Sequence, residues 1–428
     1  MGFLSFLKSK PEPATAPASA PAAAAATPAP RAVPEAIVVR TEIVDERNQL
    51  CGYRFSAQPD DTLVETLVAA GVPEFAQQRM ALVPIGLALA AQNGHQPLAA
   101  PHTVFVIDRR QAGAPVAEIA GHMAALRASG QVGLRGVTLD EEDAPLLAQC
   151  DVAVMHLGDL PLAEFQALTR QLRMRYPQLK LLVDGVDAWD EQRMCLSWGC
   201  HYFMGQFLTT TDKVDPDARI DQSRMTSIEL LNLLRTDAEL PALIDVAKRD
   251  PGMTYQVLQW ANAPGNGQTT KVTSLQQAFL VLGRNQLYRG LTVSMFRLGG
   301  GDKARDESLL EMALTRARFL ETCSRMPQAR RDELFLVGLL SLFDVLLGVP
   351  MARLVDEIHL SDDIRAVLLS RDGAYGPYLK MVLLLERDKV APALEIAATL
   401  DIDMDGLAAV GQAAFKWAQD SLRQTGGE

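Results

Sequence analysis

Residues 152–184 read VAVMHLGDLPLAEFQALTRQLRMRYPQLKLLVD and contain one complete repeating unit of the fold. Val152–His156 and Leu181–Asp184 are short apolar runs, which are typical of buried strands. Between them, Leu162–Tyr176 carries apolar residues three and four positions apart, which predicts a helix with one buried face. A strand, a helix and a second strand in this order predict two parallel strands joined by a crossover helix.

The same alternation runs through residues 37–212, with further helices predicted at Thr62–Ala70, Val116–Ser129 and Glu191–Trp198. It predicts a mainly parallel barrel that opens with an antiparallel hairpin. The span of about 175 residues is shorter than a complete eight-fold barrel, so we expect a trimmed, incomplete TIM-like (β/α) barrel. The predicted strands are Ile37–Val44, Gly52–Ala57, Met80–Ile85, Thr103–Asp108, Gly136–Leu139, Val152–His156 and Leu181–Asp184.

Residues 213–428 show helical periodicity with no strand pattern, which predicts a separate all-α domain. Proline, glycine and aspartate separate the helical segments and mark the turns between them. The predicted helices are Ser227–Arg235, Ala242–Lys248, Thr254–Ala261, Ser274–Leu282, Asn285–Phe296, Asp306–Ser324, Asp332–Leu347, Met351–Glu357, Asp362–Ser370, Pro377–Glu386, Ala391–Leu400 and Met404–Arg423.

The first 36 residues differ in composition from the rest of the chain. Residues 11–36 are dominated by proline and alanine, which predicts an extended, disordered linker. Met1–Lys10 combines phenylalanine and leucine with two lysines, a pattern typical of a short amphipathic helix. Two interpretations of this tip stay open: weak docking to a membrane or partner, and a frayed terminus.

Composition and charge narrow the function. The 428 residues are 48% hydrophobic and 22% charged, which is typical of a globular protein, and no window reaches the length of a spanning helix. The net charge of −11 disfavours a large nucleic-acid interface. Five scattered cysteines lack the paired spacing of a zinc site or disulfide framework, which favours a reducing cytoplasmic location.

Beyond these general features, several short motifs are informative. RTEIVD at 40–45 with GYRF at 52–55 is similar to the opening hairpin of EAL domains, the barrels that hydrolyse cyclic di-guanylate. LLVDGVD at 181–187 and GCHYFMGQF at 199–207 resemble the last two strand ends of that family. In the helical half, 231–240, DPGM at 250–253 with WANA at 260–263, 273–283, and VGLLSLFD at 337–344 resemble HDOD domains. In this order, the two domains resemble bacterial EAL–HDOD signalling proteins.

The EAL resemblance implies a two-metal site made of carboxylates and an amide, and the matching positions lack most of it. Arg54 stands where the family has its name-giving glutamate, which replaces a metal ligand with a permanent cation. Asp184 and Asp187 match the two later glutamates as shorter acids, and Met204 replaces the final glutamine. We therefore expect no catalytic residues, no metal site and no cofactor.

The same positions leave ligand binding open. Arg54, Asp184 and Asp187 are the candidate residues of a vestigial EAL site, because a guanidinium at a strand end can hold a phosphate. The favoured alternative is that Arg54 forms an ion pair with one of the two aspartates. In the HDOD half, the resemblance implies a helical groove with Asn262, Ser341 and Asp344 as candidates and no metal pair.

These observations predict a non-catalytic signal-transduction scaffold that acts through protein–protein interaction and cyclic di-guanylate-linked regulation of motility, pili or biofilm. The alternatives are a cyclic di-guanylate receptor, a residual phosphodiesterase, and a transcription or nucleic-acid regulator. Expected partners are signalling proteins, with cyclic di-guanylate as a candidate ligand and no nucleic acid. We expect a cytoplasmic protein, with Met1–Lys10 as the candidate contact to the inner membrane.

Overall fold

The computed structural model describes residues 36–58, 62–212, 220–263, 271–297 and 302–425. The tip at residues 1–10 and nearly all of the linker at 11–36 lie outside this range. Among the described residues, no single helix has the length and apolar character needed to cross a membrane. One sharply bent pair, Gln328–Leu347 with Met351–Glu357, passes that test when its two parts are taken together.

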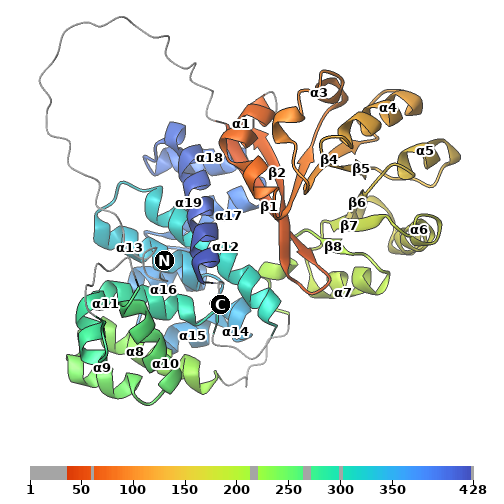
Figure 1. The fold of residues 1–428 in the computed structure, drawn as a ribbon. Helices are drawn as coiled ribbons and strands as arrows, with labels where there is room; N and C mark the ends of the chain where they lie inside the picture. The colour runs from red at the N-terminus through yellow and green to blue at the C-terminus, as the bar shows by residue number, and fades with distance from the viewer. Residues whose placement is uncertain (1–35, 59–61, 213–219, 264–270, 298–301, 426–428) are drawn as a thin grey trace, which may run out of the picture.

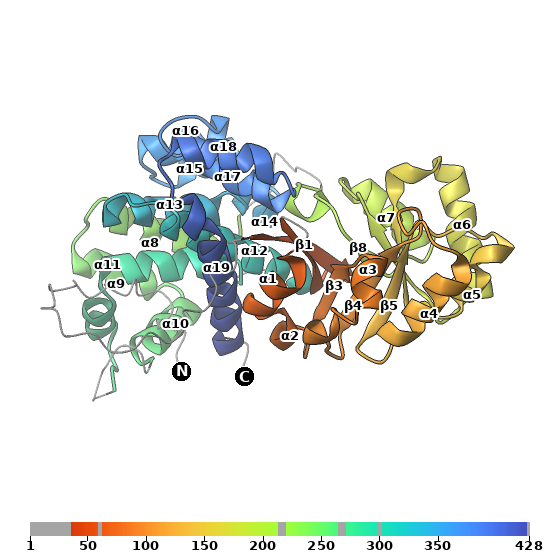
Figure 2. The same ribbon diagram turned by 90° about the horizontal axis from the view of Figure 1, so that it is seen from above.

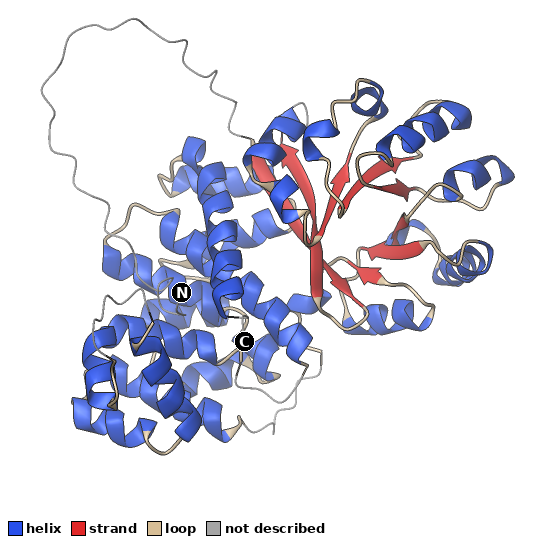
Figure 3. Ribbon diagram, viewed as in Figure 1, coloured by secondary structure: helices blue, strands red, loops and turns tan. Residues whose placement is uncertain are grey.

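The first half is a closed barrel of eight strands, drawn in red in Figure 3. Its first two strands are antiparallel, strands β2 to β8 are successively parallel, and β8 closes the barrel by pairing antiparallel with β1. The strands are β1 (Ile37–Asp45), β2 (Leu50–Gln58), β3 (Met80–Pro84), β4 (Thr103–Asp108), β5 (Gln131–Arg135), β6 (Val152–His156), β7 (Lys180–Asp184) and β8 (Tyr202–Phe203). The expected barrel and opening hairpin are confirmed.

The barrel has short helices and strands, but its sheet closes with all eight strands paired. This corrects the expectation of an incomplete barrel. Several helices around the sheet have only one or two turns, so eight strands fit into a short span. The helices are α1 (Leu63–Ala69), α2 (Val72–Phe75), α3 (Leu87–Ala91), α4 (Val116–Leu126), α5 (Ala144–Leu147), α6 (Leu162–Arg175) and α7 (Trp189–Ser197).

The strand predicted at Gly136–Leu139 is wrong. The strand at this position, β5, lies five residues earlier, and it pairs in parallel with β4 on one side and β6 on the other. Gly136 has a left-handed backbone with φ 73°, which ends the strand and starts the following loop. Val137 is buried in that loop, so its apolar character reflects packing and not a strand.

Alternate residues of the strands fill the barrel interior. A compact cluster of small and branched side chains, with Met204 at one end, occupies this space: Ile43, Leu82, Val104, Val106, Val152, Val154, Leu182 and Met204. The intervening residues face outward and join the larger core beneath the surrounding helices. This alternation follows from the two-residue period of a strand, and it determines which side chains point into the barrel.

Within residues 220–263, 271–297 and 302–425, the second half is all-α, as predicted. Side chains cap several helices: Asp250 accepts a hydrogen bond from the Met253 amide, and Ser274 accepts one from the Gln277 amide. The helices are α8 (Gln222–Arg235), α9 (Leu240–Ala247), α10 (Pro251–Ala261), α11 (Leu275–Ser294), α12 (Lys303–Thr322), α13 (Gln328–Leu340), α14 (Phe343–Leu347), α15 (Met351–Glu357), α16 (Asp362–Ser370), α17 (Gly376–Glu386), α18 (Val390–Thr399) and α19 (Met404–Thr425).

The helical half packs against one side of the barrel. Figures 1 and 2 show α12, α17 and α19 beside the β1–β2 hairpin, while α3 to α6 lie on the far side of the barrel. Phe415 of α19 enters an aromatic cluster with Tyr53, Phe55 and Phe75 of the barrel half, with ring centroids 5.0–6.4 Å from Phe415. The two halves therefore share a buried apolar interface as well as a covalent connection.

Candidate functional site at the mouth of the barrel

The carboxyl ends of the parallel strands form the mouth of the barrel, where ligands of such folds usually bind. Arg54 of β2 aligns in register with Leu82, which faces the interior, so the Arg54 side chain also points into the barrel. Arg135 is the last residue of β5 and Asp184 is the last residue of β7. By the alternation along each strand, both side chains are on the side that faces the barrel interior. Three strands thus bring charged groups to one place.

Asp184 is held between two arginines. Its Oδ2 atom lies 3.6 Å from Arg54 Nη1 and 3.7 Å from Arg135 Nη2, and the Arg54 and Asp184 side chains are only 17% and 16% exposed. Its Oδ1 atom accepts a hydrogen bond of 2.9 Å from the Gly185 amide. The predicted pairing of Arg54 with an aspartate across the barrel is therefore present.

The helical half also contributes to the mouth. Asp388, in the turn between α17 and α18, places its Oδ2 atom 3.4 Å from Arg54 Nη2. The same Nη2 atom donates to Thr41 Oγ1 of β1 at 3.3 Å. Next to this contact, Arg387 Nε donates to Gln206 Oε1 at 3.1 Å, beyond the end of β8. One turn of the helical half thus contacts the barrel mouth at two points.

Asp187, the third predicted site residue, takes part in loop structure instead of the charged group. Its Oδ1 atom accepts a hydrogen bond of 3.1 Å from the Gln206 amide, which ties the loop after β7 to the loop after β8. Its own amide and that of Ala188 donate to the Glu191 carboxylate at the start of α7. The structure thus brings Arg54 and Asp184 together and gives Asp187 other partners.

Two further residues of the mouth were missed from the sequence. Arg135 pairs with Asp184, and His156 at the end of β6 lies beside Asp184 in register. The His156 Nδ1 atom is buried without a hydrogen-bond partner in the described structure. Each residue is the last of its strand and an even number of positions from a residue that faces the barrel interior. This alternation is the sequence signal that could have identified both.

The mouth does not fit the two-metal centre implied by the family resemblance. Within the described part of the chain, no group of three or more His, Cys, Asp or Glu side chains is arranged to hold a metal ion. The two guanidinium groups beside Asp184 are positively charged and repel a divalent cation. The arrangement favours anions and ion pairs over a bound divalent cation.

The three candidates in the helical half have separate partners. Asn262 donates to the Leu258 and Val272 carbonyls and accepts from the Val272 amide, so it joins the chain on either side of residues 264–270. Ser341 Oγ accepts a hydrogen bond of 2.6 Å from Arg316 Nη1. Asp344 accepts from the Val345 amide at the start of α14, and burial raises its pKa. A ligand role for these residues stays a prediction.

A small cavity of about 80 Å³ lies between the two halves. Its charged lining residues are Arg40 and Glu42 of β1, Arg316 of α12 and Glu386 of α17. Arg316 Nε and Nη2 donate to the Glu386 carboxylate at 2.9 and 2.8 Å. Burial raises the pKa of Glu42 to about 7, and the neighbouring Glu386 adds to this shift.

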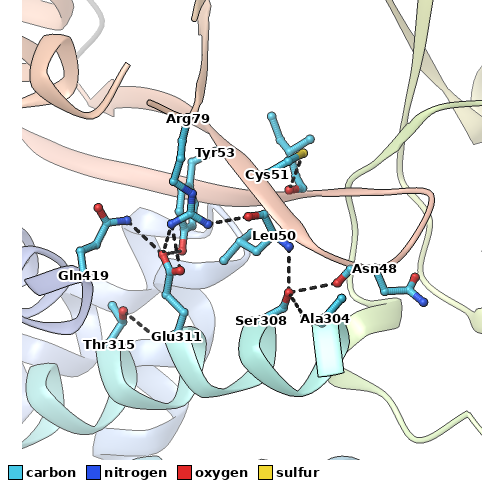
Figure 4. Close-up of polar contacts among 11 residues, drawn as sticks. Asn48, Leu50, Cys51, Tyr53, Arg79, Ala304, Ser308, Glu311, Thr315 and Gln419 are labelled. Atoms are coloured by element: carbon cyan, nitrogen blue, oxygen red, sulfur yellow. Dashed lines mark hydrogen bonds and ion pairs between the residues drawn. The ribbon is translucent and has the colours of Figure 1, made fainter. Parts of the chain in front are cut away.

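A second polar contact between the halves is centred on Glu311 of α12, as Figure 4 shows. The Glu311 carboxylate accepts hydrogen bonds from Tyr53 Oη at 2.8 Å, from Arg79 Nη1 at 2.9 Å and from Gln419 Nε2 at 3.0 Å. One turn away, Ser308 Oγ accepts from the Leu50 amide and donates to the Asn48 carbonyl. These contacts hold α12 against the β1–β2 hairpin.

Comparison with known proteins finds a family match within the helical half. Residues 225–349 match the HDOD domain family. The chain is 24% identical over 272 residues to the uncharacterized protein YuxH of Bacillus subtilis, which covers 61% of this chain and 65% of YuxH. It is 21% identical over 247 residues to the cyclic di-GMP phosphodiesterase CdgJ of Vibrio cholerae, covering 57% of this chain and 56% of CdgJ. The matches span less than two thirds of each relative.

Solved structures similar to the barrel are EAL domains. The EAL domain of Mycobacterium smegmatis DcpA is 14% identical, with a TM-score of 0.33, and the match covers 40% of this chain and 87% of that one. The EAL domain of Xanthomonas citri FimX, solved with c-diGMP, is 14% identical with a TM-score of 0.34 and covers 41% of this chain and 87% of that one.

Proposed function

We propose that this EAL–HDOD protein acts in cyclic di-guanylate signalling without hydrolysing the dinucleotide. The observation that carries the proposal is the Arg54–Asp184–Arg135 group at the barrel mouth. An acidic side chain that neutralises two arginines is a poor ligand for a divalent metal, because the metal would have to approach two fixed positive charges. Phosphodiester cleavage assisted by two metals needs the opposite charge pattern.

The way in which the two halves are joined supports a scaffold role. Hydrogen bonds, an ion pair and an aromatic cluster connect α12 and α19 to the barrel, and Arg316 of α12 pairs with Glu386 of α17. A change at the barrel can therefore reach the HDOD domain through direct contacts. On this proposal, the chain passes a signal to protein partners through its surfaces. Docking of Met1–Lys10 to the inner membrane and the absence of nucleic-acid binding remain predictions.

The phosphodiesterase alternative can be tested directly. Purified full-length protein is incubated with cyclic di-guanylate and either Mg²⁺ or Mn²⁺, and the linear product is followed by chromatography, with CdgJ as an active comparison. We expect no turnover above the rate without protein, because the mouth carries arginines in place of metal ligands. Turnover that Asp184→Ala abolishes would contradict the proposal.

A receptor role for the barrel is the second candidate, and Arg54 and Arg135 favour it. Their guanidinium groups lie within 3.7 Å of the same carboxylate, so they are close enough to each other to share one phosphate group. Solved relatives of this barrel include one that was determined with c-diGMP. Calorimetric titration of the chain with cyclic di-guanylate distinguishes a receptor from a scaffold that contacts proteins alone.

A further inference from the structure

The turn that reaches the barrel mouth has a constrained backbone. Asp388 adopts a left-handed conformation with φ 57°, and the amides of Arg387 and Lys389 both donate to the Leu384 carbonyl of α17. The turn therefore ends α17 in a defined geometry before α18 begins at Val390. This backbone geometry directs the Arg387 and Asp388 side chains toward the barrel.

This geometry places a carboxylate from the helical half on a cation of the barrel. Arg54 lies between the barrel's own Asp184, at 3.6 Å, and Asp388, at 3.4 Å. The same turn makes a second contact, between Arg387 and Gln206, which follows β8. Because β1 lies between β2 and β8, this contact and the one at Arg54 are on opposite sides of β1. The Asp388 carboxylate oxygens thus occupy the position beside the Arg54 guanidinium group that the oxygens of a bound anion would take.

The Arg54–Asp388 contact is suited to exchange. The Asp388 side chain is 33% exposed, and ion pairs that water can reach contribute little to stability. A phosphodiester offers a guanidinium the same pair of oxygen acceptors as a carboxylate does. Displacing Asp388 from Arg54 would therefore cost little in ion-pair energy, and it would release a contact that joins this turn to the mouth.

We propose that the turn between α17 and α18 is an autoinhibitory latch, in which Asp388 occupies the position on Arg54 that an anionic phosphodiester ligand takes when it binds. The proposal rests on the proposed function, because it makes this barrel mouth the place where cyclic di-guanylate is sensed. Binding of the ligand moves the turn away from the barrel and changes the surface that the HDOD domain presents. The latch thereby couples the mouth of the barrel to the helical half.

The test compares two aspartates with the same backbone conformation. Asp388→Asn removes the charge and keeps the turn, because asparagine tolerates the left-handed conformation. Asp401→Asn is the matched control, because Asp401 lies in the next turn of the same domain with φ 52° and is exposed. Each full-length variant is titrated with cyclic di-guanylate by calorimetry, and circular dichroism checks that each one is folded.

The latch predicts that Asp388→Asn lowers the dissociation constant about threefold to tenfold relative to the unmodified chain, because a competing carboxylate has been removed. Asp401→Asn should bind like the unmodified chain, and the double variant Arg54→Gln with Asp388→Asn should lose the gain. Hydrogen exchange provides a second measurement: adding cyclic di-guanylate to the unmodified chain should speed exchange at residues 386–390.

Equal dissociation constants for the Asp388→Asn and Asp401→Asn variants would overturn the latch, and so would the absence of binding by all variants. Neither result contradicts the absence of hydrolysis. Conversely, measurable turnover by the unmodified chain would contradict the non-catalytic function. The latch would still be tested by comparing the dissociation constants of the Asp388→Asn and Asp401→Asn variants. The two proposals can therefore fail independently of each other.

Discussion

At the scale of single residues, Glu42 is a carboxylate whose pKa is raised by burial between the halves. It lines the interdomain cavity with Arg40, Arg316 and Glu386. Burial raises the pKa of Glu42 to about 7 and Glu386 raises it further, while Arg316 and Arg40 lower it in part. The folded protein therefore binds a proton at Glu42 over a pH range in which the unfolded chain has released it.

This difference has a definite sign. A carboxyl group with a raised pKa in the folded state favours folding at low pH, and its contribution is lost as pH rises from about 4.5 to about 7. We expect Glu42→Gln to increase the free energy of unfolding by about 1–3 kcal/mol at pH 8 and to change it little at pH 4. Urea denaturation at both pH values measures this effect.

The control for this experiment is Glu46→Gln, because Glu46 is exposed in the turn of the same hairpin and lies outside the cavity lining. It removes the same type of charge without affecting the interface. An equal gain for both variants at pH 8 would point to overall net charge, and it would contradict the assignment of the effect to the cavity.

At the scale of elements, α12 and α13 form one of the closest helix contacts in the molecule. A Cβ atom added at Gly338 of α13 would lie 2.4 Å from the Ala317 Cα atom of α12, so glycine is needed for the helices to approach this closely. Both residues are in the interior, and α12 is also the helix that carries Glu311 to the barrel and Arg316 to the cavity between the halves. The spacing of these two helices therefore affects the interface.

Substitution of Gly338 tests this contact. We expect Gly338→Ala to lower the free energy of unfolding by about 1–3 kcal/mol, because the extra methyl group forces the helix backbones apart. Gly121→Ala is the control: Gly121 lies within α4, and a Cβ atom there meets nothing within 4 Å. This control should gain about 0.5–1 kcal/mol from better helix propensity. Thermal and urea denaturation should show opposite signs for the two variants.

At the scale of the whole molecule, Glu311 is the polar centre of the contact between the barrel and the helical half. It accepts hydrogen bonds from Tyr53 and Arg79 of the barrel and from Gln419 of α19. The Glu311 side chain is 7% exposed and that of Arg79 is 27% exposed, so little water is available to replace the carboxylate. Burial and the neighbouring Glu311 together raise the pKa of Tyr53 well above its ordinary value.

Removal of this carboxylate should weaken the contact between the halves. We expect Glu311→Ala to lower the free energy of unfolding by about 2–4 kcal/mol, because Arg79 and Tyr53 lose their buried acceptor. It should also increase the maximum dimension measured by small-angle X-ray scattering, as the halves separate. Glu307→Ala, one turn earlier on the same face of α12 but exposed to solvent, should change neither quantity.

Other results for Glu311→Ala and Glu307→Ala would assign the stability of the interface to other contacts. If Glu311→Ala lowered stability and left the scattering profile unchanged, the aromatic cluster around Phe415 would be sufficient to hold the halves together. If Glu307→Ala and Glu311→Ala lowered stability equally, the effect would come from the helix itself and not from the contact with the barrel.

The sequence by itself determined most of the order of strands and helices, the all-α second half and the place of Asp184 at the end of a strand. These properties depend on local periodicity, which is written in residues close together along the chain. Arg54, expected at a strand end, lies in the middle of β2. The strand at Gly136–Leu139 was misplaced because a buried loop residue, Val137, has the same apolar character as a strand residue. Closure of the sheet was not foreseen, because it depends on pairing between β1 and β8 over a long sequence separation.

Only the tertiary structure decided which charged groups of the two halves meet. Asp388 is 334 positions from Arg54 along the chain, and Glu311 is 258 positions from Tyr53, so no local pattern links them. Ion pairs and hydrogen bonds act over a few ångströms, and their partners are chosen by how the two halves pack. For this reason Arg54 and Asp184 could be named from the sequence, whereas the turn that contacts Arg54 could not.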